Sequence, residues 1–365
     1  MAILKSPSKI ADRIRGSLIG GAVGDALGYQ IEFETGIKPK QVTKYRNDRG
    51  IISDDTQMTL FTACALLWRE TRWANRGIAM LPPEAVYLGF LDWLGTQQRA
   101  PEHHSVSWIS GIPELNCLRD PGMTCINALS SGKAGNLGEP INNSKGCGGI
   151  MRIAPIGLFI SPEDKVGEFS SLTCALTHGH PLAILSAYTL GLIIYYTVND
   201  WAIEKAAKTA ISKMNEWQPE AYRNSRPVKI NWDEEKSELT ELLEKAISLS
   251  EEELEDIYAI SELGGGWVAE EALAISIYCS LKYKDNFKDA IIAAVNHDGD
   301  SDSTGAITGN IVGAKVGYKN IPDYYKNNIE LKDVILELAD DLASGVPVNE
   351  DGDITDKNWL KKYLI

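Results

Sequence analysis

Apolar residues recur at helical spacing along most of the chain, beginning with Ile10, Ile14 and Leu18 at every fourth position. This period places side chains on one helix face, whereas the strict alternation typical of strands is rare in this sequence. The pattern therefore predicts an all-α fold. Further helices are expected over about 54–71, 84–97, 122–131, 166–177, 182–198, 200–215, 235–248, 251–261, 268–283, 286–296 and 331–343.

Two of the expected helices carry a glycine at every fourth position. The first has Gly16, Gly20, Gly24 and Gly28, and the second has Gly305, Gly309, Gly313 and Gly317. Each glycine inside a helix costs about 1 kcal/mol relative to alanine. Such a series makes sense only where another backbone approaches closely, so we expect both helices in a tightly packed, buried centre.

Three segments differ from the rest of a single domain spanning 1–365. Residues 1–11 contain no usable motif and are interpreted as an N-terminal tail. A polar, proline-interrupted run leads into a charge-rich helix over about 217–260, which is interpreted as a surface insertion. The longest apolar stretch, 182–198, is interrupted by serine, threonine and tyrosine. It is predicted to be a buried core helix rather than a membrane span.

Composition and charge exclude several classes of protein. Hydrophobic residues make up 44% and charged residues 24%, which is typical of a globular protein. A net charge of -14 disfavours non-specific binding to nucleic acid or to anionic membranes. The N-terminus shows no signal peptide and the six cysteines form no CxxC pair. We therefore expect a cytoplasmic protein with reduced, buried thiols.

Two acidic clusters, near opposite ends of the chain, each stand at the start of an apolar helix. The first follows Ser53, and the second is the HDGDSDSTG run over 297–305. Ser53 and Ser303 would be good helix N-caps, and acids suit the first turn. Capping does not explain four acids, because close carboxylates repel one another unless cations intervene. Metal binding, by oxygen ligands that suit Mg²⁺, Mn²⁺ or Ca²⁺, is the alternative for Asp54, Asp55, Asp300 and Asp302.

Two further motifs could contact a ligand. The NNSKGCGGIMR run over 142–152 holds three glycines that would let backbone N–H groups approach a phosphate, although a plain turn fits as well. His178, at a helix boundary, could contact a ligand or could be a buried, hydrogen-bonded histidine. The glycines over 264–266 could form a ligand-facing loop, while the adjacent Trp267 is more typical of a core.

Six segments in this order resemble the ADP-ribosylglycohydrolase family, also called the dinitrogenase-reductase-activating glycohydrolase family. They are GSLIGGAVGDALGYQIEF at 16–33, SDDTQMTL at 53–60, GCGGIMRIAPIG at 146–157, LTHGHP at 176–181, GGGWVAEEAL at 264–273 and HDGDSDSTGAITGNIVGA at 297–314. The ordered set is specific, although each segment alone would be weak. The resemblance implies a single compact domain of orthogonal helices with two divalent cations, Mg²⁺ or Mn²⁺, in a central cleft.

The resemblance also implies a role for each matching residue. Residues of both acidic clusters would hold the metal ions: Ser53, Asp54 and Asp55 one of them, Asp300 and Ser303 the other, with Asp302 bridging. A catalytic carboxylate, Glu32 or Asp302, would accept a proton from water or stabilise the transition state. Residues of the ADP-ribose site would be Ser144, Gly146 and Gly148 in a phosphate-binding loop, and His178.

The implied activity is the removal of ADP-ribose from modified protein side chains, with arginine as the favoured acceptor. The enzyme would cleave a ribosyl–nitrogen bond with a water that two metal ions position. Its partner would be an ADP-ribosylated protein. An alternative from another class is an immunity-type protein that occludes an ADP-ribosyltransferase toxin, with or without hydrolysis. A metal-dependent phosphohydrolase would also use two metals, but the glycine-rich loop and His178 fit ADP-ribose better.

Overall fold

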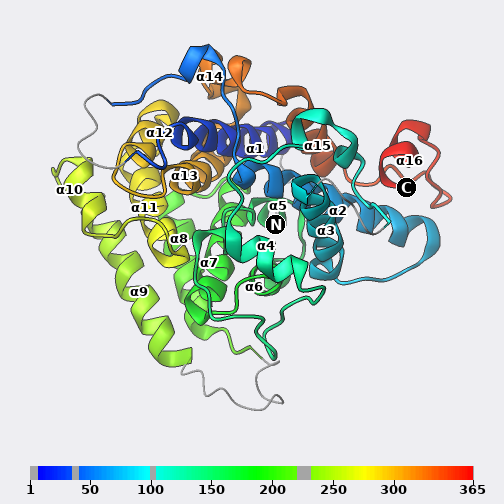
Figure 1. Ribbon diagram of the computed structural model, residues 1–365, viewed down its shortest axis with the longest axis horizontal. Coiled ribbons are helices and arrows are strands. Elements are labelled where there is room, and N and C mark those ends of the chain that lie inside the picture. Colours follow the sequence, from blue (N-terminus) through cyan, green and yellow to red (C-terminus); the bar gives the residue numbers. More distant parts are fainter. Residues whose placement is uncertain (1–6, 35–40, 99–103, 220–231, 365) are drawn as a thin grey trace.

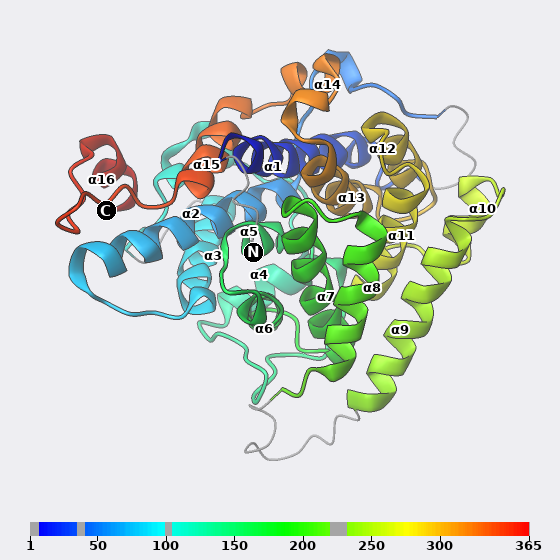
Figure 2. The ribbon, with the colours of Figure 1, turned by 180° about the vertical axis from the view of Figure 1, so that it is seen from behind.

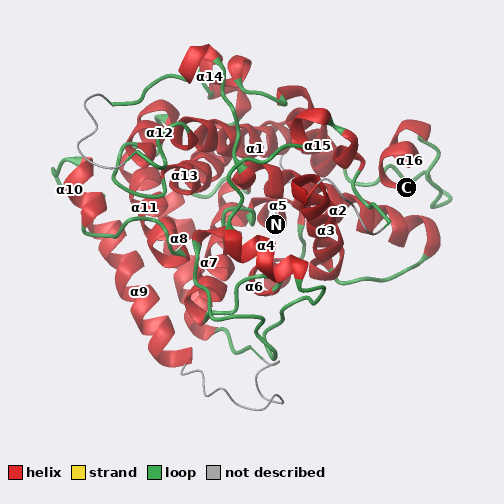
Figure 3. Ribbon diagram, in the orientation of Figure 1, coloured by secondary structure: helices red, strands yellow, loops and turns green. Residues whose placement is uncertain are grey.

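The computed structural model describes residues 7–34, 41–98, 104–219 and 232–364 (Figure 1). Among these residues there are helices and isolated bridges but no strand (Figure 3), which confirms the all-α prediction. The α-helices are α1 (Pro7–Tyr29), α2 (Asp54–Arg76), α3 (Pro82–Gln98), α4 (Met123–Ser130), α5 (Ala154–Phe159), α6 (Glu163–Ala175), α7 (Pro181–Val198), α8 (Ile203–Glu216), α9 (Trp232–Leu249), α10 (Asp256–Ser261), α11 (Ala269–Lys282), α12 (Phe287–Val295), α13 (Ser301–Val316), α14 (Asp323–Asn328), α15 (Lys332–Ser344) and α16 (Lys357–Tyr363).

Helices α1 and α13 lie side by side in both views of the molecule (Figures 1 and 2). The two glycine series face each other: a Cβ at Gly24 would collide with the carbonyl oxygen of Gly305, and a Cβ at Gly16 with that of Gly313. The close approach predicted for each helix is therefore the approach of these two backbones to one another. The side-chain amide of Asn310 donates to the Ser17 carbonyl oxygen at 2.8 Å, which ties the pair together.

This antiparallel pairing brings two distant parts of the chain to one place. Gly28, at the end of α1, lies against the backbone of Ser301, at the start of α13. The turn that follows α1 and the loop that precedes α13 are consequently neighbours. Glu32 lies in that turn, and Asp300 in that loop.

Helix α7 runs through the interior of the bundle. Its mean hydropathy of 1.6 and its length would allow it to cross a membrane, but 89% of it is buried inside the protein. Its neighbours include α6 and α8, which pack along it. The prediction of a core helix over 182–198 is confirmed.

Two predictions about the surface need correction. Helix α1 begins at Pro7, so the last part of the predicted tail over 1–11 is helical, while residues 1–6 lie outside the described residues. Helix α9, within the predicted surface insertion, buries Leu239, Leu243 and Ala246 completely. It packs on α11 and is built into the core, and even its Lys236 is buried, with Nζ donating to the carbonyl oxygens of Asn215 and Trp217.

Three α-helices are absent from the expected set. They are α5, α14 and α16, and each has six or seven residues. Two turns or fewer are too short to show a helical period in the sequence. The six cysteines are all free, but Cys117 and Cys147 are only half-buried, contrary to the expectation that the thiols are buried.

Candidate active site

The first acidic cluster forms the N-terminus of α2. Ser53 is the N-cap, and its Oγ accepts a hydrogen bond from the Asp55 N–H at 3.2 Å. The loop before α4 holds Asp54 at two points: the Asp54 N–H donates to the Arg119 carbonyl oxygen at 3.2 Å, and the Gly122 N–H donates to Asp54 Oδ2 at 3.1 Å. The sequence places acids here because the positive end of a helix dipole favours them.

The second cluster forms the N-terminus of α13. Asp300 is the N-cap, and its Oδ1 accepts from the Ser303 N–H at 3.2 Å, while Asp302 Oδ1 accepts from the same N–H at 2.9 Å. Ser303 is therefore the third residue of the helix, and its interpretation as an N-cap is wrong. The Asp300 N–H donates to the Gly265 carbonyl oxygen at 2.9 Å, which joins the triple-glycine loop to the site.

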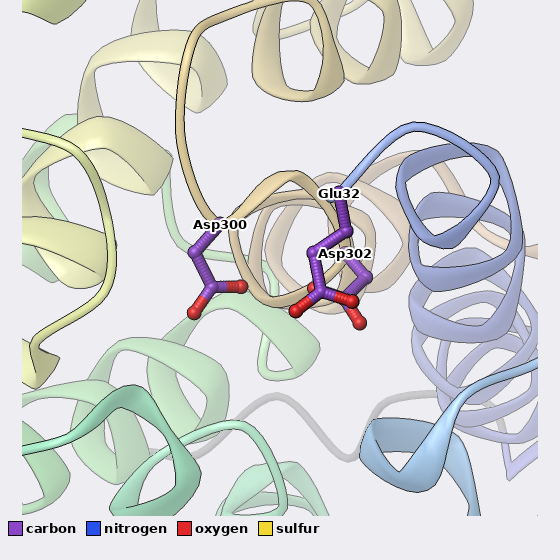
Figure 4. A group of neighbouring side chains, drawn as sticks. All are labelled: Glu32, Asp300 and Asp302. Atoms are coloured by element: carbon purple, nitrogen blue, oxygen red, sulfur yellow. The ribbon is translucent and has the colours of Figure 1, made fainter. Parts of the chain in front are cut away.

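Three carboxylates converge at the junction of α1 and α13. One oxygen from each of Glu32, Asp300 and Asp302 lies within 4.8 Å of the others, and the side chains point toward one another (Figure 4). Asp300 and Asp302 are buried, and Glu32 is half-buried. Glu32, from the turn after α1, thus joins the two acids at the start of α13.

The electrostatics place the α2 acids in the same group. Burial raises the pKa of Asp55 well above its ordinary value, and the charges of Asp302 and Asp54 raise it further. Burial and the same Asp302 charge raise the pKa of Asp300. For Glu32, burial and then the charges of Asp302, Asp300 and Asp54 raise the pKa to about 10. The structure therefore brings both predicted acidic clusters and Glu32 together.

Asp25 belongs to this group, although sequence reasoning missed it. It is fully buried in α1, and its carboxylate accepts from the Ser53 N–H at 3.0 Å and from the Thr56 N–H and hydroxyl. Burial and the charge of Asp302 raise the pKa of Asp25 to about 7. A single acid within the apolar and glycine-rich stretch 16–28 was the signal that could have identified it.

The donor set fits hard divalent cations. Every side chain that converges here supplies carboxylate or hydroxyl oxygen, which Mg²⁺ and Mn²⁺ prefer. Asp55 Oδ2 is buried and has no hydrogen-bond partner within the described chain. Buried polar atoms are normally partnered, and repulsion among these acids also calls for positive charge. Both features are those of a site that a cation completes.

The glycine-rich loop lies beside this acidic group. The Cys147 N–H donates to the Trp267 carbonyl oxygen at 3.1 Å, and the Ala269 N–H donates to the Lys145 carbonyl oxygen at 2.7 Å. These bonds fix the loop to the start of α11. Loop and acids meet at Cys147: burial raises the pKa of its thiol well above the ordinary value, and the charges of Asp300 and Asp55 raise it further.

His178 lies directly beneath the same loop. A Cβ added at Gly146, Gly148 or Gly149 would lie 3.2–3.4 Å from the imidazole ring, so the glycines allow the loop to rest on it. The Gly146 N–H also donates to Ser144 Oγ at 3.3 Å. The structure thus gathers the predicted substrate-binding residues Ser144, Gly146, Gly148 and His178. The His178 side chain is buried and bonded to Thr177, as in the second of its two interpretations.

Comparison with known proteins identifies the family of this chain. The sequence profile of the ADP-ribosylglycohydrolase family matches residues 6–352. The chain belongs to the ADP-ribosylglycohydrolase family. Among its curated relatives, the ADP-ribosylarginine hydrolase Tri1 of Serratia proteamaculans is 27% identical, covering 93% of this chain and 81% of that protein. The ADP-ribosylhydrolase ARH1 of Dictyostelium discoideum is 26% identical over 91% of this chain and 94% of its own length.

A solved structure supports the fold assignment. A chain described as an ADP-ribosylglycohydrolase-related protein complex aligns with a TM-score of 0.61 at 21% identity, covering 92% of this chain and 98% of that chain. The resemblance stated from six segments is confirmed at the level of the family. Membership of the ADP-ribosylglycohydrolase family supports a hydrolase of ADP-ribosyl bonds, and the acidic group could hold a metal.

A cavity of about 460 Å³ opens at the end of α1. Its lining includes Tyr29 and Phe33 of the α1 end, Arg46, Arg49 and Asp120. The Tyr29 hydroxyl donates to Asp120 Oδ2 at 2.6 Å, closing one side of the cavity. The lining residues of this cavity include none of the metal-ligand candidates, although Asp120 belongs to the loop that holds Asp54.

The metal-free protein is expected to lose stability as the pH rises from about 6 to 9. Since the pKa is raised to about 7 in Asp25 and about 10 in Glu32, the folded state binds more protons than the unfolded chain over this range. The resulting stabilisation is complete below the ordinary carboxyl pKa and is lost as pH rises through the folded values. Thermal unfolding in EDTA across this range measures the effect.

The matched control for that measurement is Asp302→Asn. Asp302 is the largest charged contributor to the raised pKa of Asp25 and Glu32, so its neutralisation should flatten the dependence on pH. Excess Mg²⁺ should also flatten the dependence of stability on pH, because bound cations neutralise the carboxylates in place of protons. A metal-free protein whose melting temperature rises toward pH 9 would contradict the electrostatic description of the site.

Proposed function

We propose that this protein removes ADP-ribose from modified arginine side chains by cleaving the ribosyl–nitrogen bond. The observation that carries the proposal is the convergence of carboxylates from α1, α2 and α13 beside a glycine-rich loop. The hydrolysis of such a bond needs a positioned water and a base, and the loop suits a diphosphate. Similarity to an ADP-ribosylarginine hydrolase along most of the chain supports arginine as the acceptor.

Two divalent cations, Mg²⁺ or Mn²⁺, complete the proposed site. The residues that would hold them are Ser53, Asp54, Asp55, Asp300, Asp302 and Ser303. When bound, the cations supply positive charge and Lewis-acid positions that fix ribose hydroxyls and water. The orphaned Asp55 Oδ2 and the mutual repulsion of the buried acids support this assignment.

Glu32 is proposed as the general base rather than Asp302. Its carboxylate is half-buried and so can be reached by water, whereas Asp302 is buried among the other acids and bonded to the Ser303 N–H. As water attacks the anomeric carbon and the bond to the guanidinium nitrogen breaks, Glu32 takes the proton of the water.

The ADP part of the substrate is proposed to lie on the glycine-rich loop. Ser144, Gly146 and Gly148 would present backbone N–H and hydroxyl groups to the diphosphate, with His178 supporting them from below. Because Cys147 of this loop lies close enough for the Asp300 charge to raise the pKa of its thiol, the distal ribose would lie next to the carboxylates. The acceptor side chain is proposed to enter from the side of the cavity beside Tyr29 and Asp120.

Glu32→Gln should lower kcat at least a hundredfold, about 2.7 kcal/mol of transition-state stabilisation. The amide cannot take the proton from water, but it keeps the size of the side chain. The affinity for ADP-ribose should change less than threefold, because the loop residues make those contacts. Single-turnover kinetics and calorimetry separate the two effects. Glu34→Gln, a nearby exposed acid, is the matched control, and equal losses in the two variants would argue against Glu32 as the base.

The acceptor is tested with substrates ADP-ribosylated on arginine or on serine, each incubated with Mg²⁺ or with EDTA. Release of ADP-ribose from the arginine substrate alone, and only with Mg²⁺, is expected. Release from the serine substrate alone would overturn the acceptor assignment while leaving a hydrolase. Equal release in EDTA would overturn the role of the metal ions.

The immunity-type alternative rests on the apolar tip of the N-terminal segment, which lies outside the described residues. No contact among the described residues favours it, so hydrolysis is the function that we propose. An ADP-ribosylated protein is the proposed partner. The cytoplasm is the proposed compartment, in keeping with six free cysteines.

A further inference from the structure

Arg152 is buried without a carboxylate partner. Its guanidinium lies 4.4 Å from the centroid of the Phe90 ring, and Nη1 donates to the sulfur atoms of Met58 at 3.3 Å and Cys125 at 3.2 Å. Among the residues that the structure describes, no acid forms an ion pair with it. A buried guanidinium is expensive unless it is paired, so a role beyond core packing is expected.

The remaining contact of Arg152 leads to His178. Arg152 Nη2 donates to Thr177 Oγ1, and Thr177 Oγ1 lies 2.8 Å from His178 Nδ1. A guanidinium can only donate, so the Thr177 oxygen accepts from it and keeps its own hydrogen. That hydrogen can be donated to Nδ1, which then acts as an acceptor. With Nδ1 as the acceptor, the proton of a neutral His178 would be on Nε2.

The Nε2 edge of His178 faces the glycine-rich loop. A Cβ at Gly146 would lie 3.4 Å from Nε2 and 3.5 Å from Ser144 Oγ. Nε2 has no hydrogen-bond partner among the described residues, although the imidazole as a whole is buried. Nε2 is not among the side-chain atoms that are both buried and unpartnered, so it keeps some exposure, and water or a ligand can supply its acceptor. A phosphate oxygen on the loop would supply one.

We propose that Arg152 and Thr177 are positioning residues that hold His178 as its Nε2–H tautomer, so that this N–H donates to the diphosphate of the substrate. The identity of the ligand rests on the proposed function. Burial and then the charge of Arg152 lower the pKa of His178 well below its usual value, which keeps the ring neutral. A neutral imidazole has one N–H, so the choice of nitrogen decides whether it can bond to phosphate.

The tautomer is observed directly by NMR of the protein labelled with ¹⁵N-histidine. The chain has five histidines, and a His178→Gln variant identifies the signal of His178. The proposal expects an unprotonated Nδ1 and a protonated Nε2 throughout the range from pH 6 to 8. Protonation on Nδ1 would overturn it, because Thr177 would then accept from His178 and turn its hydroxyl toward Cys125.

The binding of ADP and of adenosine, measured by calorimetry in the presence of Mg²⁺, tests whether the His178 N–H bonds to the diphosphate. Thr177→Val should weaken ADP binding about tenfold, which is about 1.4 kcal/mol, and leave adenosine binding unchanged. Thr177→Ser, which keeps the hydroxyl, should restore ADP binding. Equal weakening of both ligands, or no weakening of either, would show that Thr177 only packs in the core.

These measurements do not depend on turnover. If no ADP-ribosyl substrate is hydrolysed but Thr177→Val selectively weakens ADP, the proposed function fails and the positioning role stands. If hydrolysis is normal but His178 carries its proton on Nδ1, the positioning role fails alone. The wild-type NMR result decides the proposal even where a variant fails to fold.

Discussion

Replacing Asp302 by asparagine is expected to abolish hydrolysis while leaving the fold intact. The charge of Asp302 raises the pKa of five neighbouring acids: Asp25, Glu32, Asp54, Asp55 and Asp300. Asp302 is also the proposed ligand between the two metal sites. Its loss should reduce kcat at least a thousandfold, about 4 kcal/mol of transition-state stabilisation. Removing one charge from repelling carboxylates should also raise the melting temperature of the metal-free protein.

The loss of activity should coincide with weaker metal binding. Calorimetric titration with Mn²⁺ measures the second effect, and Asp298→Asn is the matched control because Asp298 lies in the same acidic run but is exposed. Near-normal turnover by Asp302→Asn at saturating Mg²⁺ would mean that Asp302 only helps to start α13. Equal losses in both variants would point to the net charge of the run rather than to the position of Asp302.

Gly24→Val should destabilise the protein by more than about 3 kcal/mol, at or beyond the upper end of typical overpacking costs. A Cβ at Gly24 would collide with the carbonyl group of Gly305 and the backbone nitrogen of Ala306. These are backbone atoms of a helix and cannot rotate away as a side chain can. The change would separate α1 from α13, and with them Glu32 from Asp300.

Denaturant unfolding, followed by circular dichroism, measures this cost. Gly111→Ala is the control, since a Cβ there meets no atom within 4 Å, and its effect should stay within about 0.5 kcal/mol. Gly24→Ala should fall between the two variants. A Gly24→Val protein as stable as the wild type would contradict the close approach of the two backbones.

Periodic features of the sequence predicted most of the fold. The glycine series of α1 and α13 indicated close backbone contact because glycine in a helix has a cost that only packing can offset. Neither glycine series indicates which helix it packs against. The structure shows that the two series pack against each other, with Gly24 against Gly305. Short helices such as α5 were missed because two turns give too few residues to define a period.

The candidate site was predicted in part. The acids of 53–55 and 300–302 were found because several carboxylates next to hydroxyls exceed what capping requires. Asp25 was missed because a single acid in a helix has many ordinary explanations, and its role depends on contacts with Ser53 and Thr56 across the fold. The interpretation of Ser303 as an N-cap was wrong, because Asp300 is the N-cap of α13. The pairing of Arg152 with Thr177 could not be read from spacing at all.

The central claim is that the acids of α2, α13 and the turn after α1 form one site for divalent cations. Crystals grown with Mn²⁺ and measured at the manganese absorption edge test it most directly, because anomalous peaks locate the ions without reference to activity. The account predicts two peaks, one against Asp54 and Asp55 and the other against Asp300, with Asp302 in contact with both. Peaks elsewhere on the molecule, or none at this site at saturating Mn²⁺, would contradict it.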